Sequence, residues 1–198
     1  MPADLVVLAT RNAAKLRELA RILGAEVPLA GLDAFPGAHD VPETGTTFEE
    51  NALLKARAIA QYTHLPAVAD DSGLCVDALN GMPGVLSARW AGGHGDDKAN
   101  LDLVLAQIAD VPDPRRGARF VCAAALVVPG EAAREVVVTG TVTGRLIRAR
   151  RGSGGFGYDP IFLPDGFEET TAEMTPEAKD AISHRGRAFR ALAPFITR

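Results

Sequence analysis

The sequence predicts an α/β protein with a mixed β-sheet. Short aliphatic runs typical of buried strands alternate with amphipathic helical segments through the first half of the chain, which favours parallel strands. Two longer β-rich runs, 118–130 and 134–147, follow in the middle and are joined through Pro129 and Gly130. Runs joined this closely are expected to pair as antiparallel strands, so one sheet would contain both kinds of pairing.

The first expected strand is the run 4–9, whose sequence is DLVVLA. A helix is predicted next, and Gly24 stands where a glycine commonly follows a helix. The apolar residues of this helix recur at helical spacing: Leu16, Leu19, Ala20 and Leu23. Residues 33–45 are rich in proline and glycine and are expected to form a loop.

A second helix is expected to begin just after Thr47. Thr47 and Glu50 have the spacing of a capping box, in which each side chain accepts a hydrogen bond from the other residue's backbone N–H. One face of this helix is apolar and consists of Ala52, Ala56, Ile59 and Ala60. The run 66–70 that follows is expected to be a second buried strand.

The second half contributes a third amphipathic helix at 97–109, formed around Leu101, Val104, Leu105 and Ile108. A glycine-rich loop at 150–160 leads into an expected strand at 160–164. Helical sequence begins at about Pro176 and is interrupted near 183–186 (SHRG). The chain shows no repeat or linker, so residues 1–198 are expected to form a single domain.

Composition excludes several classes of protein. With 47% hydrophobic and 23% charged residues the chain is typical of a globular protein, and a net charge of −4 disfavours a broad nucleic-acid surface. Cys75 and Cys122 lie in apolar runs without CxxC spacing, which favours buried thiols in a reducing compartment. No apolar stretch approaches the roughly 20 residues that span a bilayer, and the first residues lack a basic signal-peptide region, so a cytoplasmic protein without a membrane partner is expected.

The run 152–157 (GSGGFG) formally matches the dinucleotide-binding pattern G-x-G-x-x-G. That pattern binds pyrophosphate only when a helix follows, and here Tyr158, Asp159 and Pro160 lead into a strand, so a Rossmann site is rejected. Two interpretations stay open. The loop is either a surface turn or a platform that presents Phe156 for stacking on a flat ligand such as a purine.

The run 10–15 (TRNAAK) lies between the first strand and the first helix, where α/β proteins commonly bind anions. Thr10 offers a hydroxyl, Asn12 an amide and Lys15 a positive charge. A helix cap and a solvated lysine would explain the same residues. The same two interpretations are open near the helix interruption at 183–186. Lys179, His184 and Arg185 suit either a helix cap or an oxygen-rich ligand.

Adjacent carboxylates at Asp70 and Asp71 follow the second strand, with the turn-forming residues Ser72 and Gly73 behind them. If this strand end and the loop at Glu43 converge, their oxygens would suit Mg²⁺ with substrate phosphates. The four histidines show no zinc-ligand spacing. If the strand continues through residue 71, the two aspartates point to opposite faces and have different roles.

Five segments together resemble the inosine triphosphate pyrophosphatase family, and they cover nearly the whole chain in order: TRNAAK, ETGTTFEENALLKA, ADDSGLCVDALNGMPGVLSARWAG, GGFGYDPIF and MTPEAKDAISHRGRA. The resemblance implies an elongated central mixed sheet flanked by helices, with two lobes, an active cleft between them and a homodimeric assembly. It also implies Mg²⁺-dependent hydrolysis of ITP, dITP and XTP to the nucleoside monophosphate and pyrophosphate. A Maf-like nucleotide pyrophosphatase and a non-enzymatic nucleotide sensor are the alternatives.

The resemblance also implies roles for individual residues. Asp71 would be the general base and, with Glu43, a metal ligand. The resemblance gives no role to Asp70, which either assists the metal or forms a structural hydrogen bond to the loop. The triphosphate would be bound by Thr10, Asn12, Lys15 and Lys55, with Ser72 contacting substrate beside Asp71. The purine would be bound by Phe156, Gly157, Tyr158 and Asp159, with Phe156 stacking on it, and Lys179, His184 and Arg185 would donate towards its 6-oxo group.

Overall fold

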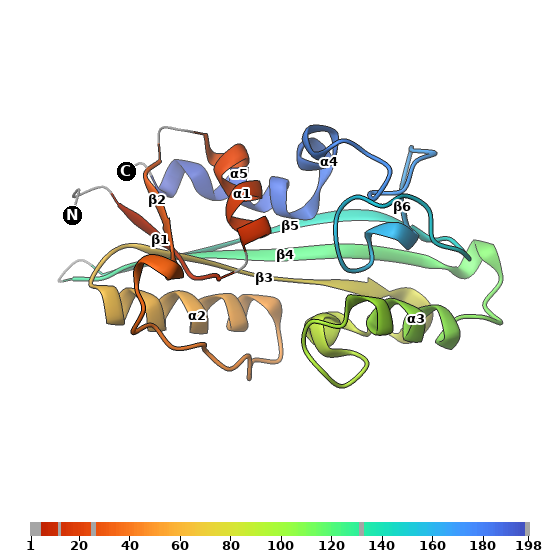
Figure 1. The fold of residues 1–198 in the computed structure, drawn as a ribbon, viewed down its shortest axis with the longest axis horizontal. Helices are drawn as coiled ribbons and strands as arrows, with labels where there is room; N and C mark the ends of the chain where they lie inside the picture. The colour runs from red at the N-terminus through yellow and green to blue at the C-terminus, as the bar shows by residue number, and fades with distance from the viewer. Residues whose placement is uncertain (1–4, 12, 25–26, 131–132, 197–198) are drawn as a thin grey trace. The chain divides into compact units, whose positions relative to one another are not determined.

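A computed structural model describes residues 5–11, 13–24, 27–130 and 133–196 (Figure 1). Its six strands form one sheet in the order β2-β1-β3-β4-β5-β6. The strands are β1 (Val6–Leu8), β2 (Leu29–Gly31), β3 (Ala67–Val76), β4 (Gly117–Val128), β5 (Arg134–Leu146) and β6 (Phe162–Pro164). The α-helices of the described residues are α1 (Ala13–Leu23), α2 (Phe48–Thr63), α3 (Asp97–Gln107), α4 (Pro176–Ile182) and α5 (His184–Ile196).

The sheet is mixed, as the sequence predicts. Strand β1 runs parallel to both β2 and β3, with Val7 opposite Ala30 on one side and Ala67 on the other. Strands β4 and β5 are neighbours joined by residues 129–133, and a connection this short permits only antiparallel pairing. Strand β6 is antiparallel to β5.

The chain folds into two compact units. Unit 1 contains residues 1–71, 122–140 and 185–198. Within it, α1 and α5 cover one face of the strands and α2 covers the other (Figure 1). The core under α1 and α5 is aliphatic and aromatic, and its fully buried members include Leu8, Leu19, Val68, Leu126, Phe189 and Leu192.

Unit 2 contains residues 72–121 and 141–184. Helix α3 packs on β3, β4 and β5 through Leu101, Val104 and Ile108. The buried Arg116 lies beside this core, and its guanidinium donates hydrogen bonds to the backbone carbonyls of Leu146 and Ile108 at 2.9 and 2.7 Å. The C-terminal turn of α3 thereby receives a positive charge, which helix dipoles favour at this end.

Most predicted elements are present. The capping box of Thr47 and Glu50 forms at the start of α2, and Gly24 follows α1 with a φ of +78°. Two differences stand out. The short strand β2 has no strand signal in the sequence, and β3 continues through Ser72 and Gly73 to Val76 where a tight turn is expected. The continuation satisfies the condition that places Asp70 and Asp71 on opposite faces.

None of the helices in the described ranges combines the length and the apolar character that crossing a bilayer requires.

Candidate active site

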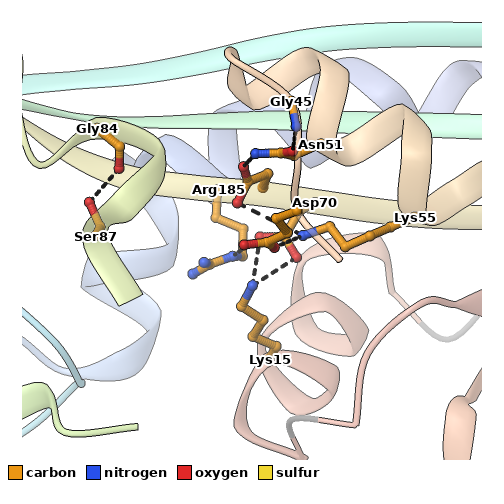
Figure 2. A network of polar contacts seen from close by, with 10 residues as sticks. Lys15, Gly45, Asn51, Lys55, Asp70, Gly84, Ser87 and Arg185 are labelled. Atoms are coloured by element: carbon orange, nitrogen blue, oxygen red, sulfur yellow. Dashed lines mark hydrogen bonds and ion pairs between the residues drawn. The ribbon is translucent and has the colours of Figure 1, made fainter. Parts of the chain in front are cut away.

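Strand β3 holds Asp70 and Asp71 side by side in unit 1, and both are almost completely buried. Asp70 lies on the side of α1 and α5. The ammonium of Lys15, on α1, is 3.2 and 3.1 Å from its two carboxylate oxygens, and Arg185 Nε, on α5, donates to Oδ2 at 3.3 Å. Figure 2 shows Lys15 and Arg185 reaching Asp70 from separate helices.

These contacts keep Asp70 ionised. Burial alone would raise the pKa of its carboxyl, but the positive charges of Lys15 and Arg185 hold that pKa well below its usual range. Burial would also lower the pKa of Arg185, which Asp70 and Glu18 instead raise. Each charge is therefore stabilised by its neighbours rather than by water.

Glu18, on α1, extends this buried set of charges. Its Oε2 accepts a hydrogen bond from Arg185 Nη1 at 2.9 Å, while its Oε1 is buried with no hydrogen-bond partner among the residues that the structure describes. Arg185 is only 1% exposed, so its guanidinium connects Glu18 to Asp70 inside the protein. The sequence prediction places Arg185 at the purine, and in the structure its Nε and Nη1 donate to these two carboxylates.

Asp71 lies on the side of α2. Its Oδ2 accepts a hydrogen bond from Asn51 Nδ2 at 2.9 Å, and its Oδ1 is 3.8 Å from Lys55 Nζ. Burial raises the pKa of Asp71 to about 6, with the negative charge of Glu43 adding to the rise and the ammonium of Lys55 and the Asn51 hydrogen bond opposing it. A carboxyl that gains and loses a proton near neutral pH is suited to acid–base chemistry.

Lys55 brings the loop carboxylate of Glu43 to the same place, because its ammonium lies 2.5 Å from Glu43 Oε1. The pKa of Lys55 is raised, because the three carboxylates of Asp71, Asp70 and Glu43 outweigh the effect of burial. The expected convergence of the loop at Glu43 with the end of the strand is therefore present within unit 1.

Local sequence explains this geometry. Asn51 and Lys55 are four residues apart on α2, so they project from the same face of the helix towards β3. The capping box at Thr47 fixes where that helix begins. Just before it, Gly45 N donates to Asn51 Oδ1 at 2.7 Å, and a Cβ on Gly45 would lie 2.7 Å from the same oxygen. Only glycine permits the loop to approach so closely.

The donor set fits Mg²⁺. Glu43 and Asp71 flank one ammonium, which shows that their carboxylates already share a cation. Across the described ranges no group of three or more His, Cys, Asp and Glu side chains gathers as a metal site. Two carboxylates suffice for Mg²⁺, which keeps several waters and completes its shell with substrate phosphates.

The predicted purine-binding residues of unit 2 gather around Asp159. Its carboxylate is buried and accepts hydrogen bonds from Phe156 N at 2.8 Å, Thr171 Oγ1 at 2.8 Å and Lys179 Nζ at 2.6 Å. The Phe156 ring is 39% exposed, and Lys179 Nζ lies 5.0 Å from its centroid. The Asp159 carboxylate therefore holds the Phe156 loop and α4 together, with the Lys179 ammonium of α4 over the aromatic ring.

Three further predicted residues make contacts within unit 2. Tyr158 lies in its core and donates to Ser87 O at 2.8 Å, and burial raises the pKa of its hydroxyl. The His184 ring stacks on Phe120 with centroids 4.9 Å apart. Gly157 has a φ of +60°, and its N–H donates to Asp97 at 2.9 Å. A three-residue 3₁₀ turn (Asp159–Ile161) follows this loop and leads into β6, so the α-helix that a Rossmann site requires is absent there.

The remaining predicted residues lie around β1 and β3. The Thr10 carbonyl accepts from Leu32 N at 3.3 Å, directly after β1. Ser72 follows Asp71 on β3 and is half-buried. Asn12 lies outside the described residues. The sequence interpretation passed over Asn51 and Glu18, which no motif or residue spacing distinguishes from other polar helix residues.

Comparison with known proteins identifies the family. A family profile described as the Ham1 family matches residues 6–195. A dITP/XTP pyrophosphatase of Streptomyces coelicolor is 62% identical over 194 residues, which cover 96% of each chain. One from Nocardia farcinica is 63% identical over 195 residues, covering 96% of this chain and 94% of the relative.

A solved structure gives the same result. The crystal structure of a nucleoside-triphosphatase, or dITP/XTP pyrophosphatase, from Mycobacterium abscessus has a TM-score of 0.78 and 58% identity, covering 96% of this chain and 99% of that one. Matches in sequence and in fold thus extend over nearly the full length. The chain belongs to the Ham1 family.

Proposed function

We propose that this chain hydrolyses the non-standard purine nucleotides dITP, XTP and ITP to the nucleoside monophosphate and pyrophosphate, with Mg²⁺ as cofactor. Relatives that are about 60% identical over 96% of the chain carry the name dITP/XTP pyrophosphatase. The observation that carries the chemistry is the separation of the two carboxylates, because Asp70 pairs with Lys15 and Arg185 whereas Asp71 faces Asn51 and Lys55. Asp70 stays ionised beside two cations, while the pKa of Asp71 is raised to about 6.

Asp71 would accept the proton of the attacking water. The water oxygen forms a bond to the α-phosphorus, the bond from that phosphorus to the α–β bridging oxygen breaks, and pyrophosphate leaves with the electron pair. Lys15 and Lys55 would neutralise phosphate charge that accumulates during this step. Thr10, Asn12 and Ser72 would contribute hydrogen bonds to the substrate.

Glu43 and Asp71 would hold the metal. When bound, Mg²⁺ supplies positive charge to the phosphate oxygens and orders the substrate. Lys55 contacts both carboxylates, so its ammonium keeps them together until a divalent cation and a triphosphate compete for them. Asp70 takes no part in the reaction in this proposal. Its ion pairs place the Lys15 ammonium instead.

The purine would stack on Phe156, with Lys179 donating towards its 6-oxo group. Adenine carries a 6-amino donor at that position, so the N–H of the Lys179 ammonium that faces the base would meet a second donor and lack an acceptor, which disfavours ATP. Asp159 would act through Phe156 and Lys179, because its carboxylate is occupied by them. Contacts from Gly157, Tyr158, His184 and Arg185 to the base are carried over from the family resemblance. So are a cleft between two lobes, a homodimer and a cytoplasmic location.

A substrate panel tests this function. The protein is incubated with Mg²⁺ and dITP, XTP, ITP, GTP, ATP or dTTP in turn, and the products are identified by anion-exchange chromatography. We expect pyrophosphate and monophosphate from the first three, with kcat/KM for ATP lower by orders of magnitude. Equal rates on ATP and ITP would refute the 6-oxo selectivity, and activity without added metal in EDTA would refute the cofactor.

A further inference from the structure

Asn51 connects the two segments that carry the proposed metal ligands. Its side chain is completely buried, and both ends of its amide are used. Nδ2 donates to Asp71 Oδ2 at 2.9 Å, and Oδ1 accepts from Gly45 N at 2.7 Å. Figure 2 shows Asn51 next to Gly45, which lies two residues after Glu43 in the loop. One side chain therefore bonds to the strand and to the loop.

The orientation of this amide is fixed by its neighbours. A carboxylate only accepts hydrogen bonds and a backbone N–H only donates, so the NH₂ end must face Asp71 and the oxygen must face Gly45. The loop is also packed tightly, because a Cβ on Gly45 would meet Asn51 Oδ1 and Glu50 Cβ, each at 2.7 Å. The bridge thus has a single arrangement and little room for another.

The bridge also decides which oxygens remain for a metal. Asn51 occupies Asp71 Oδ2, and Asp71 Oδ1 is the oxygen that lies 3.8 Å from Lys55 Nζ. The same ammonium contacts Glu43 Oε1 at 2.5 Å. The Asn51 hydrogen bond therefore leaves Asp71 Oδ1 on the side of Lys55, whose ammonium also contacts Glu43 Oε1.

We propose that Asn51 is a positioning residue that holds the Glu43 loop against Asp71 and so preforms the divalent-cation site. This inference rests on the metal site of the proposed function. A residue that orients metal ligands without binding the metal typically contributes 10–100-fold in metal affinity. The loss of Asn51 should then weaken metal binding and leave nucleotide binding in the absence of metal unchanged.

The experiment measures Mn²⁺ binding by electron paramagnetic resonance, using the metal alone as probe, so the readout does not depend on turnover. Wild type is compared with Asn51→Leu, which keeps the branching at Cγ and has no hydrogen-bonding group. The matched control is Asn100→Leu. Asn100 is an equally buried helix asparagine in unit 2, whose amide also joins two segments, donating to Ala88 O at 3.2 Å and accepting from Ala91 N at 2.7 Å.

We expect the Mn²⁺ dissociation constant of Asn51→Leu to rise 10–100-fold, while that of Asn100→Leu changes by less than about twofold. Affinity for dITP measured in EDTA should remain within about threefold of wild type in both variants. In turnover assays, the half-saturating Mg²⁺ concentration should rise much more than the KM for dITP.

Gly45→Ala provides a second route if Asn51→Leu does not fold, because its Cβ pushes against the same Asn51 oxygen from the loop side. Unchanged Mn²⁺ affinity in folded Asn51→Leu or Gly45→Ala would overturn the inference. So would an equal loss in Asn100→Leu, which would indicate a general effect of destabilisation. If wild type itself binds no Mn²⁺, the proposed metal site fails along with the inference, and the wild-type measurement identifies that failure.

Discussion

Asp70 and Asp71 are neighbours on one strand, yet their carboxylates contact different helices: Asp70 binds Lys15 and Arg185 from α1 and α5, and Asp71 binds Asn51 from α2. The alternation of side chains along a strand produces this separation. Two identical residues thereby acquire opposite behaviour. The Asp70 carboxylate is held ionised by cations. The pKa of the Asp71 carboxyl is raised into the range where it exchanges protons near neutral pH.

Asp71→Asn is expected to lower kcat on dITP by about 10³-fold or more, because it removes both the proposed base and a metal ligand. Nucleotide affinity should be largely retained, since Lys15 and Lys55 remain. Steady-state kinetics and calorimetric titration of dITP in EDTA measure the two quantities. Turnover within tenfold of wild type would remove Asp71 as the base.

The raised pKa of Asp71 predicts a pH-dependent stability in the metal-free protein. The folded pKa is about 6 and the ordinary value is 3.8, so the folded state binds more protons than the unfolded state between these values. Protonation of Asp71 therefore contributes to the free energy of unfolding. The contribution is fully present below about pH 4 and is lost as pH rises through about 6.

Urea unfolding in EDTA at pH 5 and pH 8 checks this prediction with Asp71→Asn as reference. The stability of the variant relative to wild type should increase from pH 5 to pH 8 by about 1–2 kcal/mol. A relative stability that is constant or falls with pH would show that the Asp71 pKa is not raised.

Asp70→Asn is expected to destabilise the fold by about 3 kcal/mol, because the buried Arg185 and the partly buried Lys15 would lose their shared carboxylate. Asp102→Asn is the matched control, since Asp102 also pairs with two cations, Lys98 and Arg150, but at the surface. Its stability should hardly change. Denaturant midpoints compare the two, and equal effects would contradict the structural role of the buried pairs.

Gly155→Ala is expected to disrupt the Phe156 loop. Gly155 has a φ of +69°, and a Cβ there would lie 2.1 Å from Asp159 Oδ2, the atom that binds Phe156 N and Lys179. The KM for dITP should rise at least tenfold. Gly166→Ala controls for backbone strain, because Gly166 has a φ of +83° and open space around it. Similar KM values for both variants would show that the contacts of Asp159 do not support substrate binding.

Much of the fold follows from local signals. The capping box at Thr47 and the glycine after α1 mark helix ends through interactions between residues close in sequence, and both are confirmed. Strand β2 has only three residues and is held by its pairing with β1, which no local pattern reveals. Ser72 and Gly73 favour a turn locally, but pairing within the sheet keeps them in β3.

The site could be predicted only in part for the same reason. Glu43, Lys55 and Asp71 were identifiable as charged residues near a strand end and in its neighbouring loop and helix. The partners of Asp70 could not be found, because Arg185 is 115 residues away in sequence and Glu18 lies on another helix. Asn51 is likewise recognisable only when the two groups that its amide joins are both in place.

Hydrolysis in H₂¹⁸O, followed by ³¹P NMR of the products, tests the central claim most directly. With dITP and Mg²⁺, attack of water on the α-phosphorus predicts one ¹⁸O atom in the nucleoside monophosphate and none in the pyrophosphate. Asp71→Asn should form neither product at a detectable rate. Label in the pyrophosphate, or release of orthophosphate, would contradict attack at the α-phosphorus.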